Sequence, residues 1–189
     1  MTVELDVTIG QSDQAIFQIV GLPEGAVRES RERVRAAIGN AGFWFPAGRV
    51  TANLAPADIR KEGAAFDLPL AIGVLAASNA VPTDRLGRFG MVGELRLNGE
   101  VRPVRGALPL ALGARNEGLE GLLIPADNAS EAAVVEGIDI IPVTTLAEAV
   151  QFLSGEAPIL PYVAPPFGQR AGSDAVVGVP DLAEVYGQT

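Results

Sequence analysis

Alternation of apolar and polar residues marks the first twenty positions of the chain. Apolar side chains fall at every second position over residues 3–9 and again over residues 15–19, with a short polar break between the two runs. This period of two predicts two β-strands, because successive side chains of a strand point to opposite faces. Strands this close in sequence are most simply paired with each other, so the pattern predicts a β-hairpin.

Over residues 23–42 the apolar period changes to that of a helix of about four turns, with Pro23 near its start and glycines at its end. A third alternating run at residues 49–54 predicts another strand, and a polar loop then leads to a second helix. The interior of that helix, residues 70–77, is apolar almost all round. We therefore expect it at the centre of the fold, with Asp67 as its N-cap.

The second half of the chain reads as a hairpin followed by alternating helices and strands. Asn98-Gly99 stands between alternating runs at residues 93–97 and 100–104, and this pair favours a type I′ turn, in which both residues have positive φ. The other periodic segments predict helix 106–116, strand 122–124, helix 129–136, strand 138–143 and helix 146–153. Together these elements describe an α/β domain.

The composition of the chain changes near residue 155. Five prolines follow among small residues, and such a segment buries too little apolar surface to fold on its own. We therefore divide the chain into a domain at residues 1–155 and a Pro-rich linker at residues 156–189. An apolar pattern restarts at residues 181–189, which we expect to lead into a further module.

The chain contains no cysteine and no histidine. Thiol nucleophiles, thiolate zinc sites and histidine general bases are therefore excluded. The sequence also lacks a Gly-x-x-x-x-Gly-Lys-Ser/Thr phosphate loop, so it is not expected to hydrolyse ATP itself. No apolar run reaches the roughly 18 residues of a membrane span, and the first residues do not resemble a signal peptide, so we expect a cytoplasmic protein.

The net charge of −9 is spread unevenly along the chain. Residues 1–115 carry 13 basic and 12 acidic side chains, whereas residues 116–189 carry 1 basic and 11 acidic side chains. A globally acidic chain is a poor ligand for nucleic acid, because lysine and arginine supply most non-specific affinity for phosphate. Any contact with DNA is therefore expected to be local, or to be made by another part of a longer protein.

Three stretches of the sequence, in this order, resemble the N-terminal domain of the ComM/YifB family of magnesium-chelatase-like AAA+ proteins. They are Ile19-Val-Gly-Leu-Pro23 with residues 27–34, Asn53-Leu-Ala-Pro-Ala-Asp58 with Lys61-Glu-Gly63 and Phe66-Asp-Leu-Pro69, and Gly93-Glu-Leu with Gly99-Glu-Val-Arg-Pro103. The resemblance covers residues 3–155. Residues 181–188 look like the short segment that leads into the AAA+ module in this family.

The resemblance implies a fragment that ends just before its ATPase module, so that ATP and Mg²⁺ bind in that module and no cofactor binds in this chain. It implies three partners, namely the AAA+ module of the same protein, the other subunits of a hexameric ring, and DNA. The full protein would then be a DNA-processing helicase, associated with branch migration in recombination and natural transformation. Two other classes stay open: a self-contained hydrolase built on residues 53–69, and a small-molecule-binding α/β module.

The same region is similar, more distantly, to the proteolytic domain of Lon, which implies an α/β fold with a mixed central sheet. A serine–lysine dyad needs a hydroxyl nucleophile beside an amine. On this resemblance the serine position falls on Ala65 and the lysine position falls on Leu108. The nearest serine after Lys61, the only lysine, is Ser78. We therefore expect no catalytic residues and no peptidase activity.

Arg28, Arg31 and Arg35 lie one above another on the first predicted helix. Glu29 and Glu32 are close enough in sequence to pair with them, so one interpretation is a solvated, salt-bridged helix face. The other interpretation is a docking face for a neighbouring subunit or for DNA phosphate.

Charged residues also crowd the loop before the central helix, namely Asp58, Arg60, Lys61 and Asp67. One interpretation gives them turn and capping roles, with Lys61 on the surface. The other makes this loop a docking site for a subunit or the AAA+ module. Trp44 is expected to pack the first helix against the sheet, with base stacking as the alternative.

Overall fold

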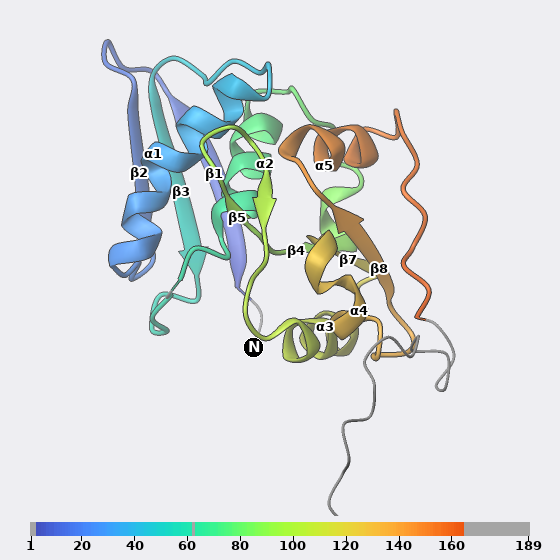
Figure 1. The fold of residues 1–189 in the computed structure, drawn as a ribbon. Coiled ribbons are helices and arrows are strands. Elements are labelled where there is room, and N and C mark those ends of the chain that lie inside the picture. The colour runs from blue at the N-terminus through green and yellow to red at the C-terminus, as the bar shows by residue number, and fades with distance from the viewer. Residues whose placement is uncertain (1–2, 62, 165–189) are drawn as a thin grey trace, which may run out of the picture.

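The computed structural model describes residues 3–61 and 63–164, and no helix in this part of the chain is long and apolar enough to cross a membrane. Figure 1 shows two α/β halves that share the central helix α2. The helices and strands are, in order, β1 (Glu4–Gly10), β2 (Ile16–Val20), α1 (Gly25–Asn40), β3 (Arg49–Ala55), α2 (Asp67–Ala77), β4 (Phe89–Met91), β5 (Glu94–Leu95), β6 (Val101–Arg102), α3 (Ala107–Asn116), β7 (Gly121–Pro125), α4 (Ala129–Ala132), β8 (Asp139–Val143) and α5 (Leu146–Leu153).

The first sheet is mixed and has the strand order β1-β3-β2. Strand β3 pairs antiparallel with β1 and parallel with β2. The predicted hairpin of the first two strands is therefore wrong, because β3 lies between them. Every second residue of β3 is buried, at Val50, Ala52 and Leu54. A strand with such an apolar face buries more of that face in the middle of a sheet than at its edge. In the middle its backbone N–H and C=O groups are also hydrogen-bonded on both sides.

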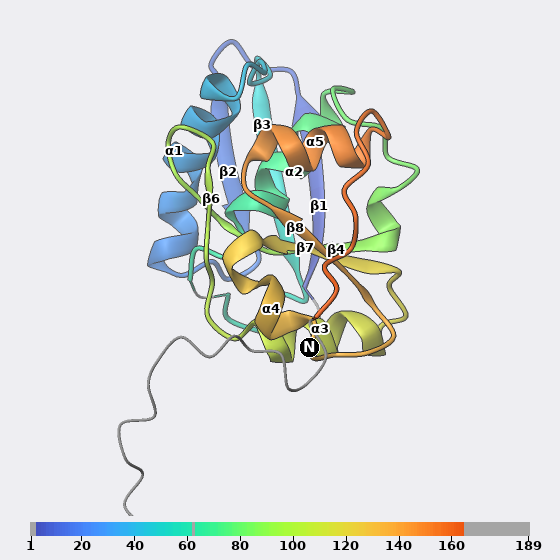
Figure 2. The ribbon, with the colours of Figure 1, turned by 45° about the vertical axis from the view of Figure 1, so that its right-hand side comes forward.

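Helices α1 and α2 cover one face of this sheet (Figure 1, Figure 2). The odd-numbered residues of β1 are half-buried and the even-numbered ones are exposed, as the alternation predicts. The approach of α2 to β1 is close: a Cβ added at Gly73 would lie 2.8 Å from the Cγ2 of Val7. Glycine at this position therefore sets the distance between the helix and the strand.

Helix α2 occupies the centre of the fold, as predicted. It contacts β1, α1, β3, β5 and α5, and eight of its eleven residues are buried. The prediction that Asp67 caps this helix is wrong. The N-cap is Phe66, and the carboxylate of Asp67 makes no capping hydrogen bond.

The second sheet is parallel, with the order β4-β7-β8. All five residues of β7 are buried, and they alternate between two apolar clusters. Leu122 and Ile124 belong to a cluster with the alanines of α3 and α4, whereas Leu123 belongs to the main core around α2. The α/β fold class with a mixed sheet is thus confirmed, and this parallel sheet is a second layer beside the mixed one. Helix α4 ends at Ala132, four residues earlier than predicted, although Val135 beyond it is still buried.

The predicted hairpin is confirmed as the antiparallel pair β5 and β6. Its turn differs from the expected type I′, since Gly99 has a positive φ of 86° and Asn98 does not. The loop has three residues, closed by the hydrogen bond from the N–H of Arg96 to the carbonyl of Glu100 at 2.8 Å. The Oδ1 of Asn98 accepts the N–H of Glu100 at 3.1 Å, an Asx-turn contact that explains why this residue keeps an ordinary φ.

Helix α5 begins at a side-chain cap. The Oγ1 of Thr145 accepts the backbone N–H of Glu148 at 3.1 Å. We expect Thr145→Ala to lower the free energy of unfolding by about 1 kcal/mol, because one helix N–H loses its partner. Chemical denaturation measures this change, and Thr145→Ser, which keeps the hydroxyl, is the control. Equal losses in the two variants would show that the cap does not stabilise the helix.

Residues 156–164 contain no helix or strand, but they contact the domain. The backbone N–H of Tyr162 donates to the carbonyl of Ile140 at 2.8 Å, and Ile159 packs against the main core. The boundary at residue 155 stays a prediction. Residues 165–189, which include the rest of the predicted linker and the apolar segment 181–189, lie outside the described residues.

Candidate functional site

The two positions at which the resemblance to Lon predicts a serine–lysine dyad, residues 65 and 108, carry inert side chains. Ala65 lies in the turn before α2, and its carbonyl accepts the N–H of Gly93 at 2.9 Å. Leu108 lies in the first turn of α3, and its N–H donates to the carboxylate of Glu131 at 3.1 Å. In the described part of the chain the ammonium of Lys61 hydrogen-bonds to a backbone carbonyl and to no hydroxyl. This arrangement supplies no nucleophile for acyl transfer.

Lys61 is almost fully buried, with 1% of its surface exposed, so the expectation of a surface lysine is wrong. Its backbone forms an isolated parallel bridge with Pro23, through hydrogen bonds to Leu22 and Glu24. The bridge brings residue 61 against the start of α1, and the side-chain ammonium donates to the carbonyl oxygen of Pro56. Lys61 therefore fastens the loop 56–61 to the beginning of α1.

Asp67 also lies in the interior, where it joins three elements. Its fully buried carboxylate accepts hydrogen bonds from the hydroxyl of Ser30, from the Nε of Arg33 at 2.7 Å and from the backbone N–H of Leu95 at 3.2 Å. The hydrogen bond to Asp67 raises the pKa of the Arg33 guanidinium, and partial burial opposes that rise. This network binds α1, α2 and β5 together. Sequence reasoning missed Arg33, although it lies three residues after Ser30 on one helix face.

The arginines Arg28, Arg31 and Arg35 line α1 as expected, but their contacts differ from the predicted ones. Arg28 donates to the carbonyl of Pro23 at 3.1 Å, and Arg31 donates to the carbonyl of Arg28 at 3.0 Å. Arg35 donates to the carbonyl of Ala15 at 3.2 Å.

The acidic neighbours on the same helix do not neutralise these three arginines. Within the described ranges, Glu29 and Glu32 take part in no ion pair. The predicted pairing of the arginines with Glu29 and Glu32 is therefore wrong.

The loop residues Asp58 and Arg60 are exposed. Arg60 forms an ion pair with Glu24 at 3.1 Å, just before the first turn of α1, where Arg28 also bonds to the backbone. The structure thus gathers Arg28 and Arg60 at one end of α1. Arg35 lies about two turns further along the helix than Arg28.

Trp44 is 91% exposed, so the expectation that it packs the helix against the sheet is wrong. Its neighbours Phe43 and Phe45 fulfil that role, since both pack against the main core. Residues 43–46 form no helix, and side chains of such an extended segment alternate in direction. With Phe43 and Phe45 turned inward, Trp44 points to solvent.

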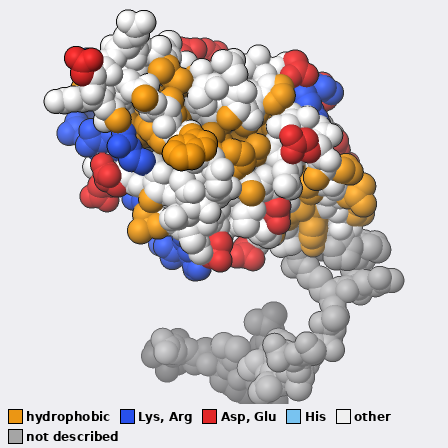
Figure 3. Space-filling model, turned by 90° about the horizontal axis from the view of Figure 1, so that it is seen from above, with side chains coloured by type: hydrophobic (Ala, Val, Ile, Leu, Met, Phe, Trp, Pro, Cys, Tyr) orange, Lys and Arg blue, Asp and Glu red, His pale blue; other side chains and the backbone are white. Residues whose placement is uncertain are grey.

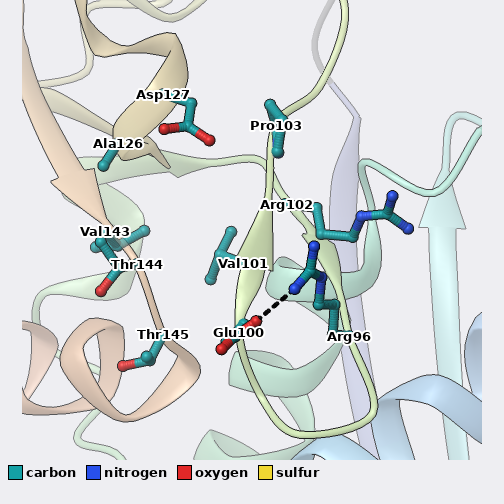
Figure 4. Close-up of a pocket in the computed structure, with 10 residues that line it drawn as sticks. All are labelled: Arg96, Glu100, Val101, Arg102, Pro103, Ala126, Asp127, Val143, Thr144 and Thr145. Atoms are coloured by element: carbon teal, nitrogen blue, oxygen red, sulfur yellow. Dashed lines mark hydrogen bonds and ion pairs between the residues drawn. The ribbon is translucent and has the colours of Figure 1, made fainter.

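A depression with a volume of about 320 Å³ lies between the β5–β6 hairpin and the ends of β7 and β8 (Figure 4). Ligands of parallel sheets commonly bind at the carboxyl ends of strands. Here, however, Arg96 is paired with Glu100, and the hydroxyl of Thr144 is held by the carboxylate of Glu148 at 2.7 Å. In Figure 4 the guanidinium of Arg96 reaches toward Glu100, and the guanidinium of Arg102 points away from Asp127. The depression therefore brings together no acid–base or nucleophile pair.

The residues described here do not fit an ATP–magnesium site. Residues 3–61 and 63–164 hold no group of three or more Asp, Glu, His or Cys side chains arranged to bind a metal ion. The 189 residues also contain no phosphate loop.

Comparison with known proteins places these features in a family. A family described as "Subunit ChlI of Mg-chelatase" matches residues 3–128. The chain is 41% identical over 188 residues to competence protein ComM of Haemophilus influenzae, covering 100% of this chain and 36% of that protein. It is 40% identical over 156 residues to the uncharacterized protein YifB of Escherichia coli, covering 82% and 30% of the two chains. Lon protease 2 of Bacillus subtilis is 28% identical over 163 residues, covering 78% and 29%. The chain spans about a third of the length of the ComM and YifB relatives.

Proposed function

Because the chain belongs to the ComM/YifB family of magnesium-chelatase-like proteins, we propose that it is the accessory, non-ATPase domain of an AAA+ protein that processes DNA. The proposal is supported by the distant similarity to Lon protease 2 of Bacillus subtilis, together with Ala65 and Leu108 at the two positions where that similarity predicts the dyad. A domain that has the Lon framework without its reactive groups acts by binding other parts of the assembly or DNA, and it does not catalyse peptide hydrolysis.

In this proposal ATP and Mg²⁺ bind to an AAA+ module elsewhere in the whole protein, which works in the cytoplasm. The whole protein assembles as a hexameric ring and moves branched DNA during recombination and natural transformation. The domain contributes contacts to neighbouring subunits, to its AAA+ module or to DNA. The surface groups that support such a role are Arg28 and Arg31 on α1, which are exposed and bonded only to backbone carbonyls, and the exposed loop with Asp58 and Arg60.

The proposal is tested on the whole protein encoded by the gene. We expect a Walker A motif within about 50 residues after Thr189, ATP hydrolysis that DNA stimulates, and loss of hydrolysis when the Walker lysine is replaced. A matched substitution in this domain, Ala65→Gly, is expected to leave ATP hydrolysis unchanged.

The rival peptidase function is tested with the same protein. We expect no cleavage of an unfolded protein such as casein, with or without ATP, because the dyad positions carry alanine and leucine. Cleavage that disappears on Ser78→Ala, or a whole protein without a Walker A motif, would overturn the proposed function.

A further inference from the structure

The depression between the β5–β6 hairpin and the ends of β7 and β8 lies where the chain leaves the parallel sheet in two directions. Helix α4, which follows β7, packs with the apolar cluster that contains Leu122 and Ile124. Helix α5, which follows β8, packs with the main core, which contains Leu123. Successive side chains of a strand point to opposite faces, so the two helices cover opposite faces of the sheet. Open α/β sheets commonly bind their ligands at such a point, outside the carboxyl ends of two adjacent parallel strands.

Backbone contacts hold the walls of this depression in place. The buried side chain of Asn128 accepts the N–H of Val104 at 2.8 Å and donates to the carbonyl of Val104 at 2.9 Å. The N–H of Val101 donates to the carbonyl of Thr144 at 2.8 Å. These bonds fix the residue after Asp127 to the chain that leaves β6, and they fix β6 to the end of β8. The depression is therefore pre-formed, and its volume of about 320 Å³ is at the lower end of the range for small ligands.

Four charged side chains line the depression, and three of them already have a partner. They are Arg96, Glu100, Arg102 and Asp127. Arg96 pairs with Glu100 at 2.8 Å, and Arg102 pairs with Glu94 at 3.2 Å. In the part of the chain that the structure describes, the exposed carboxylate of Asp127 takes part in no ion pair. The depression therefore offers one negative charge that nothing in these residues neutralises.

The carboxylate of Asp127 adjoins apolar groups. In Figure 4 it points into the space between Ala126 and Pro103, and Val101 lines the same depression. A lysine or arginine side chain has the matching pattern, because its methylene stem packs against apolar groups while its charged head stays in water or meets a carboxylate.

Other classes of ligand fit the depression less well. Residues 116–164 carry eight acidic side chains and no basic one, so the local field disfavours an anion. A divalent metal ion needs several oxygen ligands, and within residues 3–61 and 63–164 no three acidic side chains gather to bind one. A wholly apolar ligand fits better on the face of the molecule seen from above, where hydrophobic side chains gather at the centre (Figure 3).

We propose that this depression is a binding site for an alkyl cation, that is, a guanidinium or ammonium group on an aliphatic chain. The charged group pairs with Asp127, and the aliphatic chain lies along Val101 and Pro103. An arginine or lysine side chain of a partner protein and a free polyamine share this chemistry. The site includes neither of the dyad positions nor the arginines of α1, so the inference goes beyond the proposed function.

Nuclear magnetic resonance of the ¹⁵N-labelled 189-residue chain tests the site. The probe is a blocked tripeptide with arginine between two glycines. We expect amide shifts that concentrate at residues 126–128 and 144–145 and that saturate with a Kd on the order of 1 mM, as a small ligand with one partly exposed ion pair gives. The same tripeptide with neutral citrulline in place of arginine is expected to bind about ten-fold more weakly, because it loses the charge-assisted hydrogen bonds.

Two variants locate the charge that binds the probe. Asp127→Asn keeps the size of the side chain and removes its charge, so we expect it to weaken binding of the arginine tripeptide by about ten-fold. Asp139→Asn is the matched control, because Asp139 is exposed at the start of β8, outside the depression, and joins no ion pair in the described residues. It should bind like the wild type within about two-fold. The amide spectra of both variants also show whether the fold is kept.

Spermidine is the second probe and separates the two sources of the cation. Tighter binding of spermidine than of the tripeptide at the same residues supports a site for free polyamines, and the reverse order supports a site for a protein side chain. Three outcomes would overturn the inference: no shifts at about ten times the expected Kd, equal binding of the citrulline tripeptide, or wild-type affinity in Asp127→Asn. None of them touches the proposed function, which is tested by the DNA-stimulated ATP hydrolysis of the whole protein.

Discussion

Replacing Asp67 by alanine is expected to lower the free energy of unfolding by about 3–5 kcal/mol, the range for breaking a buried ion pair on one side. The variant leaves the hydroxyl of Ser30 and the N–H of Leu95 without their acceptor, and it removes the partner of Arg33. Because Asp67 touches α1, α2 and β5 together, its loss loosens the packing of the central helix. Urea denaturation followed by circular dichroism measures the change.

Two milder variants separate the contributions to this network. Ser30→Ala removes one neutral donor and is expected to cost about 1–2 kcal/mol. Asp67→Asn keeps the size and two polar atoms but removes the charge that Arg33 needs, so its cost should fall between those of the other two variants. If Asp67→Ala cost less than about 1 kcal/mol, the buried carboxylate would not be what joins the three elements.

Gly21→Ala is expected to cost about 2–5 kcal/mol. Gly21 follows β2 directly and has a φ of 94°, a conformation that costs an L-residue about 1–2 kcal/mol. A Cβ on this residue would also overlap the carbonyl oxygen of Leu54 in β3, and relieving such overpacking costs a further 1–3 kcal/mol or so. The turn between β2 and α1 therefore depends on a residue with no side chain, and thermal or urea denaturation will show the loss.

Gly42→Ala is the matched control for this experiment. Gly42 has a similar φ of 88°, but a Cβ there would meet nothing within 4 Å. Its substitution is expected to cost only the conformational part, about 1–2 kcal/mol. Equal costs at the two positions would contradict the close approach of Gly21 to β3.

The type and order of nearly all the elements could be predicted from the sequence. Helix α5 spans the predicted residues 146–153, and β3 and β8 differ from their predicted ranges by one residue. Helix α5 has a period of 3.6 and β3 alternates along its whole length, while β8 is a short apolar run, so neighbours in the sequence suffice to define them. The central place of α2 was predicted for the same reason, because a helix that is apolar on all sides must be surrounded.

The errors concern residues whose environment comes from far along the chain. Alternation shows that β1 and β2 are strands, but the insertion of β3 between them depends on residues more than thirty positions away. Lys61 was expected on the surface, but its bridge to Pro23 holds it against the start of α1. Asp67 was expected to cap a helix, but it is buried and hydrogen-bonds to Arg33 and to the backbone of Leu95.

By itself the sequence determined which local structures form and which chemistry is missing, because both depend on side-chain identity and spacing along the chain. Only the tertiary structure decided that Phe43 and Phe45 turn inward and leave Trp44 in solvent, and that Asp67 closes a buried ion pair. The physical reason is that burial is shared among segments. A side chain is buried or exposed according to what the rest of the chain places over it, and its neighbours in sequence do not record that.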